Sequence, residues 1–203
     1  MITNGVYAMS AITALTAQNT TGVTAIMEST PEFLGEQLES IFTDIYPDAV
    51  KIGMVSSSSL IKTISDKLKK YDAKNIVVDP VMVATSGGEL AKDDLSQNLL
   101  KYLLPKAILT TPNVSEAEKL TGIKIADKEK AEIACEKLGK ICNNIITGGH
   151  LNGTNITCID GKINTFKQEL LKTDNVHGSG CNFSAAIVSY FCLLYTSPSP
   201  RDA

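Results

Sequence analysis

Apolar runs of strand length alternate along this chain with longer segments in which apolar residues recur at helical spacing. The spacing is clear in 31–45, where Leu34, Leu38 and Ile41 fall three or four positions apart. The predicted strands cover 7–18, 23–27, 49–52, 75–79, 107–110 and 144–147, followed by a hairpin of 155–159 and 162–168. The predicted helices cover 31–45, 58–71, 93–104, 128–138 and 179–191. A further helix is expected to open at the capping-box pattern of Ser115 and Glu118.

Strand–helix alternation with short connections predicts an α/β fold with a mostly parallel sheet that is covered on both faces. No internal repeat or linker divides the chain, so we expect one domain. In such sheets, ligands bind beyond the carboxyl ends of the strands. The polar residues and glycines that interrupt the apolar pattern lie at those ends, at Gln18, Gly53, Met54, Asp79, Asn113, Gly148, Gly149 and the glycine turn before Ser179.

Composition narrows the classes of function. The 203 residues are 43% apolar, enough for a sizeable core, and the net charge of −3 is spread without a basic run, which argues against nucleic acid as a partner. No apolar run could span a bilayer, and the start lacks a secretory-signal pattern. The five cysteines show neither CxxC pairs nor zinc spacing, which favours reduced thiols in a cytosolic protein. His150 and His177 lack neighbouring ligands, so no transition-metal site is expected.

The strongest chemical signal is the segment NVHGSGC (175–181), which leads straight into a predicted helix. Its glycines allow a tight turn that points successive N–H groups at one spot, where the helix dipole adds positive potential. Such a turn can hold a phosphate and the charge that develops during its transfer. Cys181 lies in the first helical turn, where a thiolate is favoured. The alternative is an ordinary glycine-rich loop whose cysteine belongs to the core.

Polar side chains at other strand ends are weaker signals. Asp79 could approach Mg²⁺ or its waters, although an acid before proline is also a common turn opener. Asn113 and Glu116 could reach metal-bound phosphate, and Glu116 could equally be a first-turn acid that the helix dipole favours. Gln18 could hydrogen-bond a ring substrate or be a satisfied buried amide. His150 is expected to be structural or solvent-facing.

Several segments occur together and in order: ITALTAQNT (12–20), KIGM (51–54), VDPVM (78–82), TPNVSEA (111–117), GGH (148–150) and HGSGC (177–181). The ordered set resembles the hydroxymethylpyrimidine/phosphomethylpyrimidine kinases of thiamine synthesis, and the resemblance runs from Gly5 to Phe191. It implies a ribokinase-like three-layer α/β/α sandwich around a mostly parallel sheet. Related ribokinase-like proteins phosphorylate pyridoxal or pyridoxine.

The resemblance implies a kinase that uses ATP and Mg²⁺, and it assigns residue roles. Cys181 matches the cysteine that helps to activate the substrate hydroxyl. The residues that match the anion hole are Gly178, Ser179 and Gly180. The residues that match contacts to the pyrimidine ring are Gln18, Met54 and Val81. The residues that match the groups handling Mg²⁺ and ATP phosphates are Asp79, Asn113, Glu116, Thr147 and Gly149.

The chain departs from the family's pattern in three respects. Many members have a lysine directly before Gly-Gly-His, where this chain has Thr147, which supplies a hydrogen bond but no charge. Members also open with a strand and a glycine-rich loop that precede the segment matching Met1, so 1–191 is expected to be a partial domain, truncated at both ends. Residues 192–203 look like the translated read of a sequencing adapter and are expected to lie outside the family's sequence.

The function implied is ATP-dependent phosphorylation of 4-amino-5-hydroxymethyl-2-methylpyrimidine and of its monophosphate in thiamine diphosphate biosynthesis. Two alternatives stay open. One is a pyridoxal or pyridoxine kinase of vitamin B6 salvage. The other is a non-catalytic pyrimidine-binding relative, which is considered because Thr147 replaces a charged lysine. The expected partners are a small-molecule substrate and a second copy of the chain, since family members are commonly dimers. Neither nucleic acid nor a membrane is expected, and the expected location is the cytoplasm.

Overall fold

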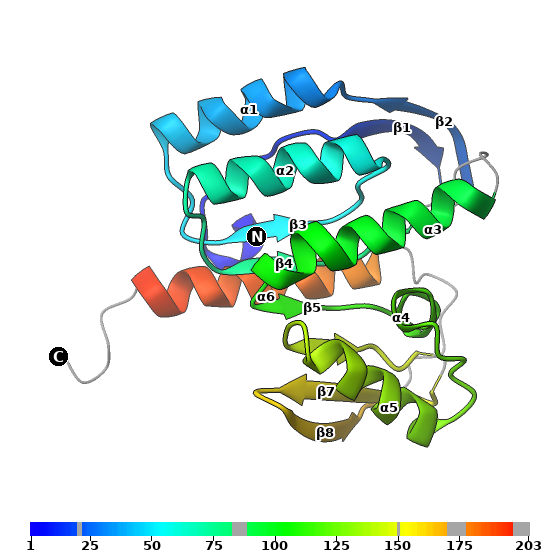
Figure 1. Cartoon of the computed structure of the whole chain (residues 1–203). Coiled ribbons are helices and arrows are strands. Elements are labelled where there is room, and N and C mark those ends of the chain that lie inside the picture. The colour runs from blue at the N-terminus through cyan, green and yellow to red at the C-terminus, as the bar shows by residue number, and fades with distance from the viewer. Residues whose placement is uncertain (20–21, 83–88, 150, 170–177, 197–203) are drawn as a thin grey trace, which may run out of the picture.

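A six-stranded sheet organises the molecule, which is described by a computed structural model over residues 1–19, 22–82, 89–149, 151–169 and 178–196. The strands, in spatial order, are β3 (Val50–Ile52), β4 (Ile76–Val78), β5 (Leu109–Thr110), β6 (Asn144–Ile146), β7 (Thr154–Ile159) and β8 (Lys162–Lys167). The first four are parallel, and β7 and β8 are antiparallel additions (Figure 1). The predicted mostly parallel α/β fold is confirmed.

Helices pack on both sides of this sheet, because its central strands are apolar on both faces. The helices are α1 (Pro31–Asp44), α2 (Ser58–Lys70), α3 (Glu89–Asn98), α4 (Val114–Thr121), α5 (Lys128–Gly139) and α6 (Ser179–Thr196). In β4, Ile76 and Val78 belong to the large core shared with α1, α2, α4 and α5, whereas Val77 packs in a second core with Val188 of α6. Figure 1 shows α6 against β3 and β4, on a face that it shares with the short N-terminal 3-10 helix, Ile2–Asn4. Among the described helices, none combines the length and apolar character needed to cross a bilayer.

A separate two-stranded sheet stands beside the main one (Figure 1). It consists of β1 (Ala14–Asn19) and β2 (Gly22–Glu28), paired antiparallel. The single strand predicted for 7–18 is too long, because strand pairing begins only at Ala14. Two side-chain bonds tie the base of this hairpin to the loop after β3: Thr13 Oγ1 donates to the Met54 carbonyl at 2.8 Å, and Ser57 Oγ donates to the Glu28 carboxylate.

The capping box of α4 was expected at the wrong residues. The N-cap is Asn113, whose Oδ1 accepts the Glu116 N–H at 2.9 Å while Glu116 Oε2 accepts the Asn113 N–H at 2.9 Å. Glu118, assigned to the box in the sequence, instead accepts the Ile125 N–H at 2.7 Å. Asn and Ser are comparable N-cap residues, and each is followed by Glu three residues later, so the sequence pattern fits a helix start at Asn113 or at Ser115. The path of the chain from β5 selects Asn113.

Two other helix boundaries differ from prediction. The helix expected over 93–104 is α3 followed by a π-helical segment, Leu99–Leu103, and a 3-10 turn, Leu104–Lys106, where Pro105 stops the regular pattern. α6 continues past Phe191 to Thr196, because Leu193 and Leu194 favour a helix and the first proline comes later, at 198. The interpretation of 192–203 as adventitious sequence stays a prediction.

The β7–β8 hairpin is confirmed where it was expected. Its turn residues, Asp160 and Gly161, have φ of 50° and 75°, the left-handed values that a two-residue type I′ turn requires. Between β6 and β7 lies a second tight connection at Gly148. The Gly148 N–H donates to Asn155 Oδ1 at 2.8 Å, and a Cβ at this position would lie 1.8 Å from the Thr154 carbonyl oxygen.

The two neighbouring glycines should therefore respond differently to alanine. Gly148→Ala is expected to lower the unfolding free energy by about 3 kcal/mol, because the backbone must move to admit the methyl group. Gly149→Ala is the matched control, since a Cβ there meets no atom within 4 Å, and should leave stability nearly unchanged. Urea denaturation of both variants checks this, and equal losses would contradict it.

Candidate active site

The carboxylate of Asp79 is buried at the carboxyl end of β4. The residue is 4% exposed, and its N–H donates to the Ile52 carbonyl at 2.8 Å, which continues the ladder from β3. Ser184 of α6 donates its hydroxyl to Asp79 Oδ2 at 2.9 Å, and Lys51 Nζ lies 3.6 Å from the same oxygen. Asp79 is therefore no surface turn opener, since its charge is paired and hydrogen-bonded inside the fold.

Glu116 lies near Asp79 from the neighbouring strand connection. It is the capping-box acid of α4, so the first-turn interpretation holds for it. Burial, with the repulsion from Asp79 as a further cause, raises the Glu116 pKa from 4.5 to about 7, against the lowering effect of the Asn113 N–H bond. The charge of Glu116 thus lacks full compensation from the protein.

The end of β6 adjoins the same edge. Thr147 forms a parallel bridge with Asn113, and its N–H donates to the Pro112 carbonyl at 2.9 Å. The Gly148 N–H is already bonded to Asn155, so it is unavailable to a ligand, whereas Gly149 is exposed and borders open space. The predicted residues Asn113, Glu116, Thr147 and Gly149 are therefore brought together with Asp79.

The first turn of α6 carries the predicted anion-binding residues. Gly178 has φ of 76°, a left-handed conformation that favours glycine. The Asn182 N–H bonds the Gly178 carbonyl at 2.9 Å, so the N–H groups of Ser179, Gly180 and Cys181 precede the first bond of the helix ladder. Cys181 is exposed, so the alternative in which this cysteine belongs to the core is wrong. Residues 175–177 of the glycine segment lie outside the described residues.

The donor set at the edge fits a hard divalent cation. Carboxylate and amide oxygens from Asp79, Glu116 and Asn113 are the ligand type that Mg²⁺ prefers. Thr111 adds a hydroxyl that is buried next to Asp79's strand and has no hydrogen-bond partner within the described residues. In the described ranges no group of three or more His, Cys, Asp or Glu residues gathers.

The ring-contact residues are less closely tied to this edge. Met54 and Val81 lie in the loops that follow β3 and β4, and the Val81 N–H donates to the Asp79 carbonyl at 2.8 Å. Gln18 is exposed in β1, so the buried-amide alternative is wrong; its Oε1 accepts the Thr16 hydroxyl at 3.3 Å. His150 and His177 lie outside the described residues.

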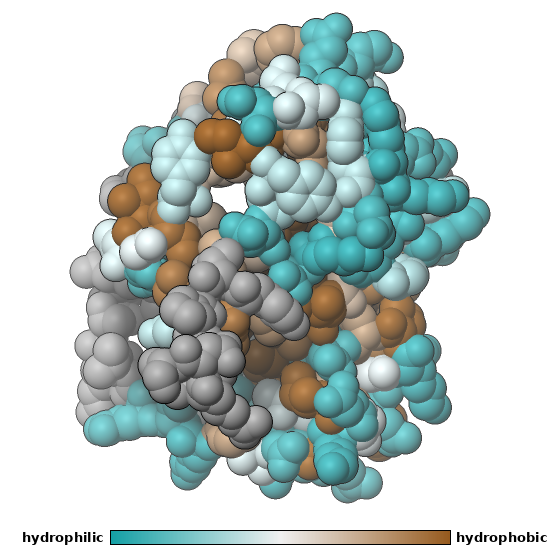
Figure 2. All heavy atoms as spheres, turned by 90° about the vertical axis from the view of Figure 1, so that its left-hand side faces the viewer, coloured by the Kyte–Doolittle hydropathy of each residue, from teal (hydrophilic) through white to brown (hydrophobic). Residues whose placement is uncertain are grey.

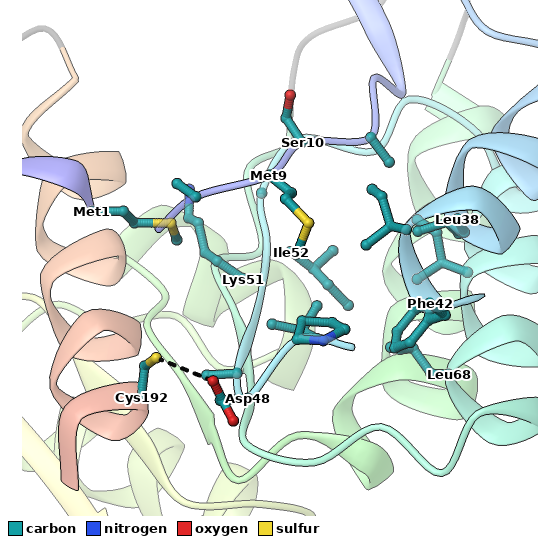
Figure 3. A pocket seen from close by; sticks show the side chains of 18 of the residues that line it. Met1, Met9, Ser10, Leu38, Phe42, Asp48, Lys51, Ile52, Leu68 and Cys192 are labelled. Carbon is teal, nitrogen blue, oxygen red and sulfur yellow. Dashed lines mark hydrogen bonds between the residues drawn. The ribbon is translucent and has the colours of Figure 1, made fainter. Parts of the chain in front are cut away.

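A cavity lies to one side of these groups. Its volume is about 750 Å³, and it separates α1 from β3 and α6. Figure 2 shows this end of the molecule hollowed, with hydrophobic atoms on the rim. Figure 3 shows Cys192 on α6 with Met1 near this helix, and Phe42 across the cavity. Among the predicted site residues in the described part of the chain, only Met54 lines it.

Sequence reasoning missed three residues near Asp79: Ser184, Lys51 and Thr111. Lys51 and Thr111 both lay inside quoted motifs, KIGM and TPNVSEA, but neither was given a role. Ser184 carried a weak signal, a lone hydroxyl within the apolar run from Phe183 to Val188. A serine in such a helix usually bonds its own backbone, so that signal could not name Asp79 as its partner.

The raised pKa of Glu116 predicts a stability that falls with pH. Between pH 5 and pH 7 the folded chain keeps a proton that the unfolded chain has released, so the unfolding free energy decreases across this window. Glu116→Gln keeps an oxygen acceptor for Asn113 and removes the titration. After discounting for solvent screening, the variant should gain about 1–2 kcal/mol relative to the parent between pH 5 and pH 8.

Urea denaturation of the metal-free protein with a chelator measures this difference. Glu118→Gln is the matched control on the same helix, because the pKa of Glu118 is lowered, chiefly by the Ile125 N–H bond. Its stabilising contribution is lost only below the ordinary glutamate range, so its difference from the parent should stay flat from pH 5 to pH 8. Parallel profiles for Glu116→Gln and the parent would contradict the prediction.

Known proteins share both sequence and fold with this chain. The sequence profile of phosphomethylpyrimidine kinase matches residues 1–199. A hydroxymethylpyrimidine/phosphomethylpyrimidine kinase of Rhizobium meliloti is 43% identical over 192 residues, which are 91% of this chain and 71% of the relative. The crystal structure of phosphomethylpyrimidine kinase from Clostridium difficile has a TM-score of 0.80 and 42% identity, over 97% of this chain and 82% of that one. An ADP complex of Bacillus subtilis pyridoxal kinase has a TM-score of 0.84 and 27% identity, over 97% and 76%. The chain belongs to the phosphomethylpyrimidine kinase family.

Proposed function

We propose that this chain phosphorylates the hydroxymethyl group of 4-amino-5-hydroxymethyl-2-methylpyrimidine, and then the resulting monophosphate, with ATP in thiamine diphosphate biosynthesis. One observation carries the proposal. The carboxylate of Asp79 and the N-terminal turn of α6, two groups of opposite electrostatic character, meet at the carboxyl edge of the sheet through the 2.9 Å bond from Ser184. Phosphoryl transfer needs that combination, because it depends on positioning and charge stabilisation.

The anion-binding turn would hold the phosphoryl group in transfer. N–H groups of Ser179, Gly180 and Cys181 face the charge that builds on its oxygens. The substrate hydroxyl oxygen forms the new bond to phosphorus as the bond to the ADP oxygen breaks. Cys181, exposed in the same turn, would accept the hydroxyl proton as its thiolate, which becomes the thiol, and would orient the nucleophile.

Asp79, Glu116 and Asn113 would hold the cation that accompanies ATP. Mg²⁺ there supplies charge neutralisation of the phosphates. Gly149, exposed and next to open space, allows the close approach of a phosphate. The ring would contact Met54 and Val81, from the loops after β3 and β4, and Gln18 from the hairpin.

A pyridoxal kinase is the second candidate, favoured by the fold similarity to the Bacillus subtilis pyridoxal kinase. Its substrate also presents a hydroxymethyl group on a flat nitrogen ring, so the same edge could serve it. The higher identity to phosphomethylpyrimidine kinases, 42% against 27% among the structures compared, favours the pyrimidine.

Replacement of the catalytic thiol should abolish pyrimidine-dependent turnover. Cys181→Ala is expected to lower kcat by about 100-fold or more, because the proton acceptor is lost. Cys192→Ala, on the same helix but away from its first turn, is the matched control and should keep parental rates. Coupled ADP release with the pyrimidine, and separately with pyridoxal, provides the measurement.

Each outcome of that assay decides between the candidates. Pyridoxal preference in the parent would move the function to vitamin B6 salvage. Pyrimidine binding without ADP release would favour the non-catalytic relative. Equal rates for Cys181→Ala and Cys192→Ala would overturn the role given to Cys181.

Restoring a lysine at position 147 should strengthen nucleotide binding. The Thr147 main chain is fixed by its bridge to Asn113, so a longer side chain can leave the backbone in place. Thr147→Lys is expected to lower the KM for ATP about 10-fold, since a charged donor exceeds a hydroxyl by about 1.5 kcal/mol. Thr147→Met, of similar length without charge, is the control. An unchanged KM in the lysine variant would show that another cation already serves the phosphate.

A further inference from the structure

The side-chain contacts of Asp79 come from two residues, Ser184 and Lys51, that have no assigned role. Ser184 is fully buried in α6, and its Oγ lies 2.9 Å from Asp79 Oδ2. Lys51, in β3, reaches the same oxygen at 3.6 Å with a side chain that is 16% exposed. Within the described residues, no hydrogen bond reaches Oδ1. One oxygen of the carboxylate is thus held by the protein, and the other is left for the site.

The Ser184 hydroxyl donates its hydrogen bond to the Asp79 carboxylate. The hydroxyl also lies 3.1 Å from the Gly180 carbonyl and 3.2 Å from the Cys181 carbonyl. A hydroxyl has one proton, and a carboxylate is a stronger acceptor than a carbonyl, so the shortest contact takes it. Ser189, also fully buried in α6, shows the ordinary pattern, a bond of 2.8 Å to the Ala185 carbonyl.

This bond sets the place of the anion-binding turn. Ser184 lies less than one helical turn after Cys181, so a bond from Ser184 to β4 fixes the distance between that turn and Asp79. Farther along α6, Val188 packs against Val77 and Leu109 and restrains the helix body but not its first turn. Lys51 differs in kind, because at 3.6 Å it compensates charge without fixing direction.

We propose that Ser184 and Lys51 are positioning residues for phosphoryl transfer. Ser184 turns the free oxygen of Asp79 toward the reacting phosphates and fastens the first turn of α6 to the end of β4, while Lys51 supplies the charge that pairs the buried carboxylate. The inference rests on the proposed kinase function, and neither residue contacts the substrate.

Matched variants in the active protein test the role of Ser184. Ser184→Ala should lower kcat about 10- to 100-fold, since a small misplacement of catalytic groups has that effect. It should also raise the Mg²⁺ concentration for half-maximal rate several-fold, with little change in the KM of the pyrimidine. Ser189→Ala removes an equally buried hydroxyl from the same helix and should change no kinetic constant more than about twofold. Equal effects of the two alanine variants would overturn the proposal.

A double-mutant cycle separates positioning from general damage. If Ser184 acts through Asp79, Ser184→Ala should change neither kcat nor the urea midpoint of the metal-free protein further once Asp79→Ala, which leaves no acceptor for the Ser184 hydroxyl, is present. Additive losses in the cycle would sink the idea. Lys51→Arg should retain most of the rate, and Lys51→Met should not.

The cycle also distinguishes failure of the inference from failure of the proposed function. If the parent prefers pyridoxal, the same variants are assayed with pyridoxal and the expectations stand, because Asp79 serves the phosphate side. If the parent turns over neither compound, the proposed function fails. Additive urea midpoints would then overturn the contact itself, and coupled midpoints with no turnover would overturn its positioning role.

Discussion

The buried carboxylate of Asp79 is the constraint on which the site depends. A charge that is 4% exposed must be paired and hydrogen-bonded, and the required partners come from β3 and α6. Meeting that requirement brings the N-terminus of α6 to the carboxyl end of β4. The same bond that solvates the acid inside the protein thereby sets an acidic group and a positively polarised helix end side by side. The same interaction therefore contributes both to the stability of the fold and to the geometry of the site.

Backbone hydrogen bonding explains why glycines in similar sequence motifs have different roles. Gly148 has a structural role. Its N–H donates to the Asn155 side chain, and the nearby Thr154 carbonyl leaves no room for a Cβ. Gly149 and Gly178 face open space, and Gly178 also needs its positive φ. A glycine-rich motif at a strand end is therefore part scaffold and part ligand surface, and only the partners of each N–H tell which is which.

Much of the fold could be predicted because its signals are local. The β7–β8 turn is encoded by Asp160 and Gly161, and α5 was placed by its apolar spacing. The start of α4 was misplaced because two cap patterns overlap in the sequence, and only the path of the chain from β5 selects Asn113. The bond between Ser184 and Asp79 joins residues 105 positions apart, so no local pattern contains it. The grouping of the predicted site residues followed from sheet geometry, whereas their supporting contacts required the packed structure.

The electrostatics of the edge link two features that the sequence presents separately. Thr147 bridges to Asn113, and Asn113 is bonded in both directions to Glu116. A cation at position 147 would therefore lie close to the Glu116 carboxylate and favour its charged form. Burial and, as a further cause, the charge of Asp79 outweigh the lowering effects of the Asn113 N–H bond and of Lys119, and raise the Glu116 pKa to about 7. A divalent cation bound at Asp79 and Glu116 would supply the charge that the neighbouring side chains do not.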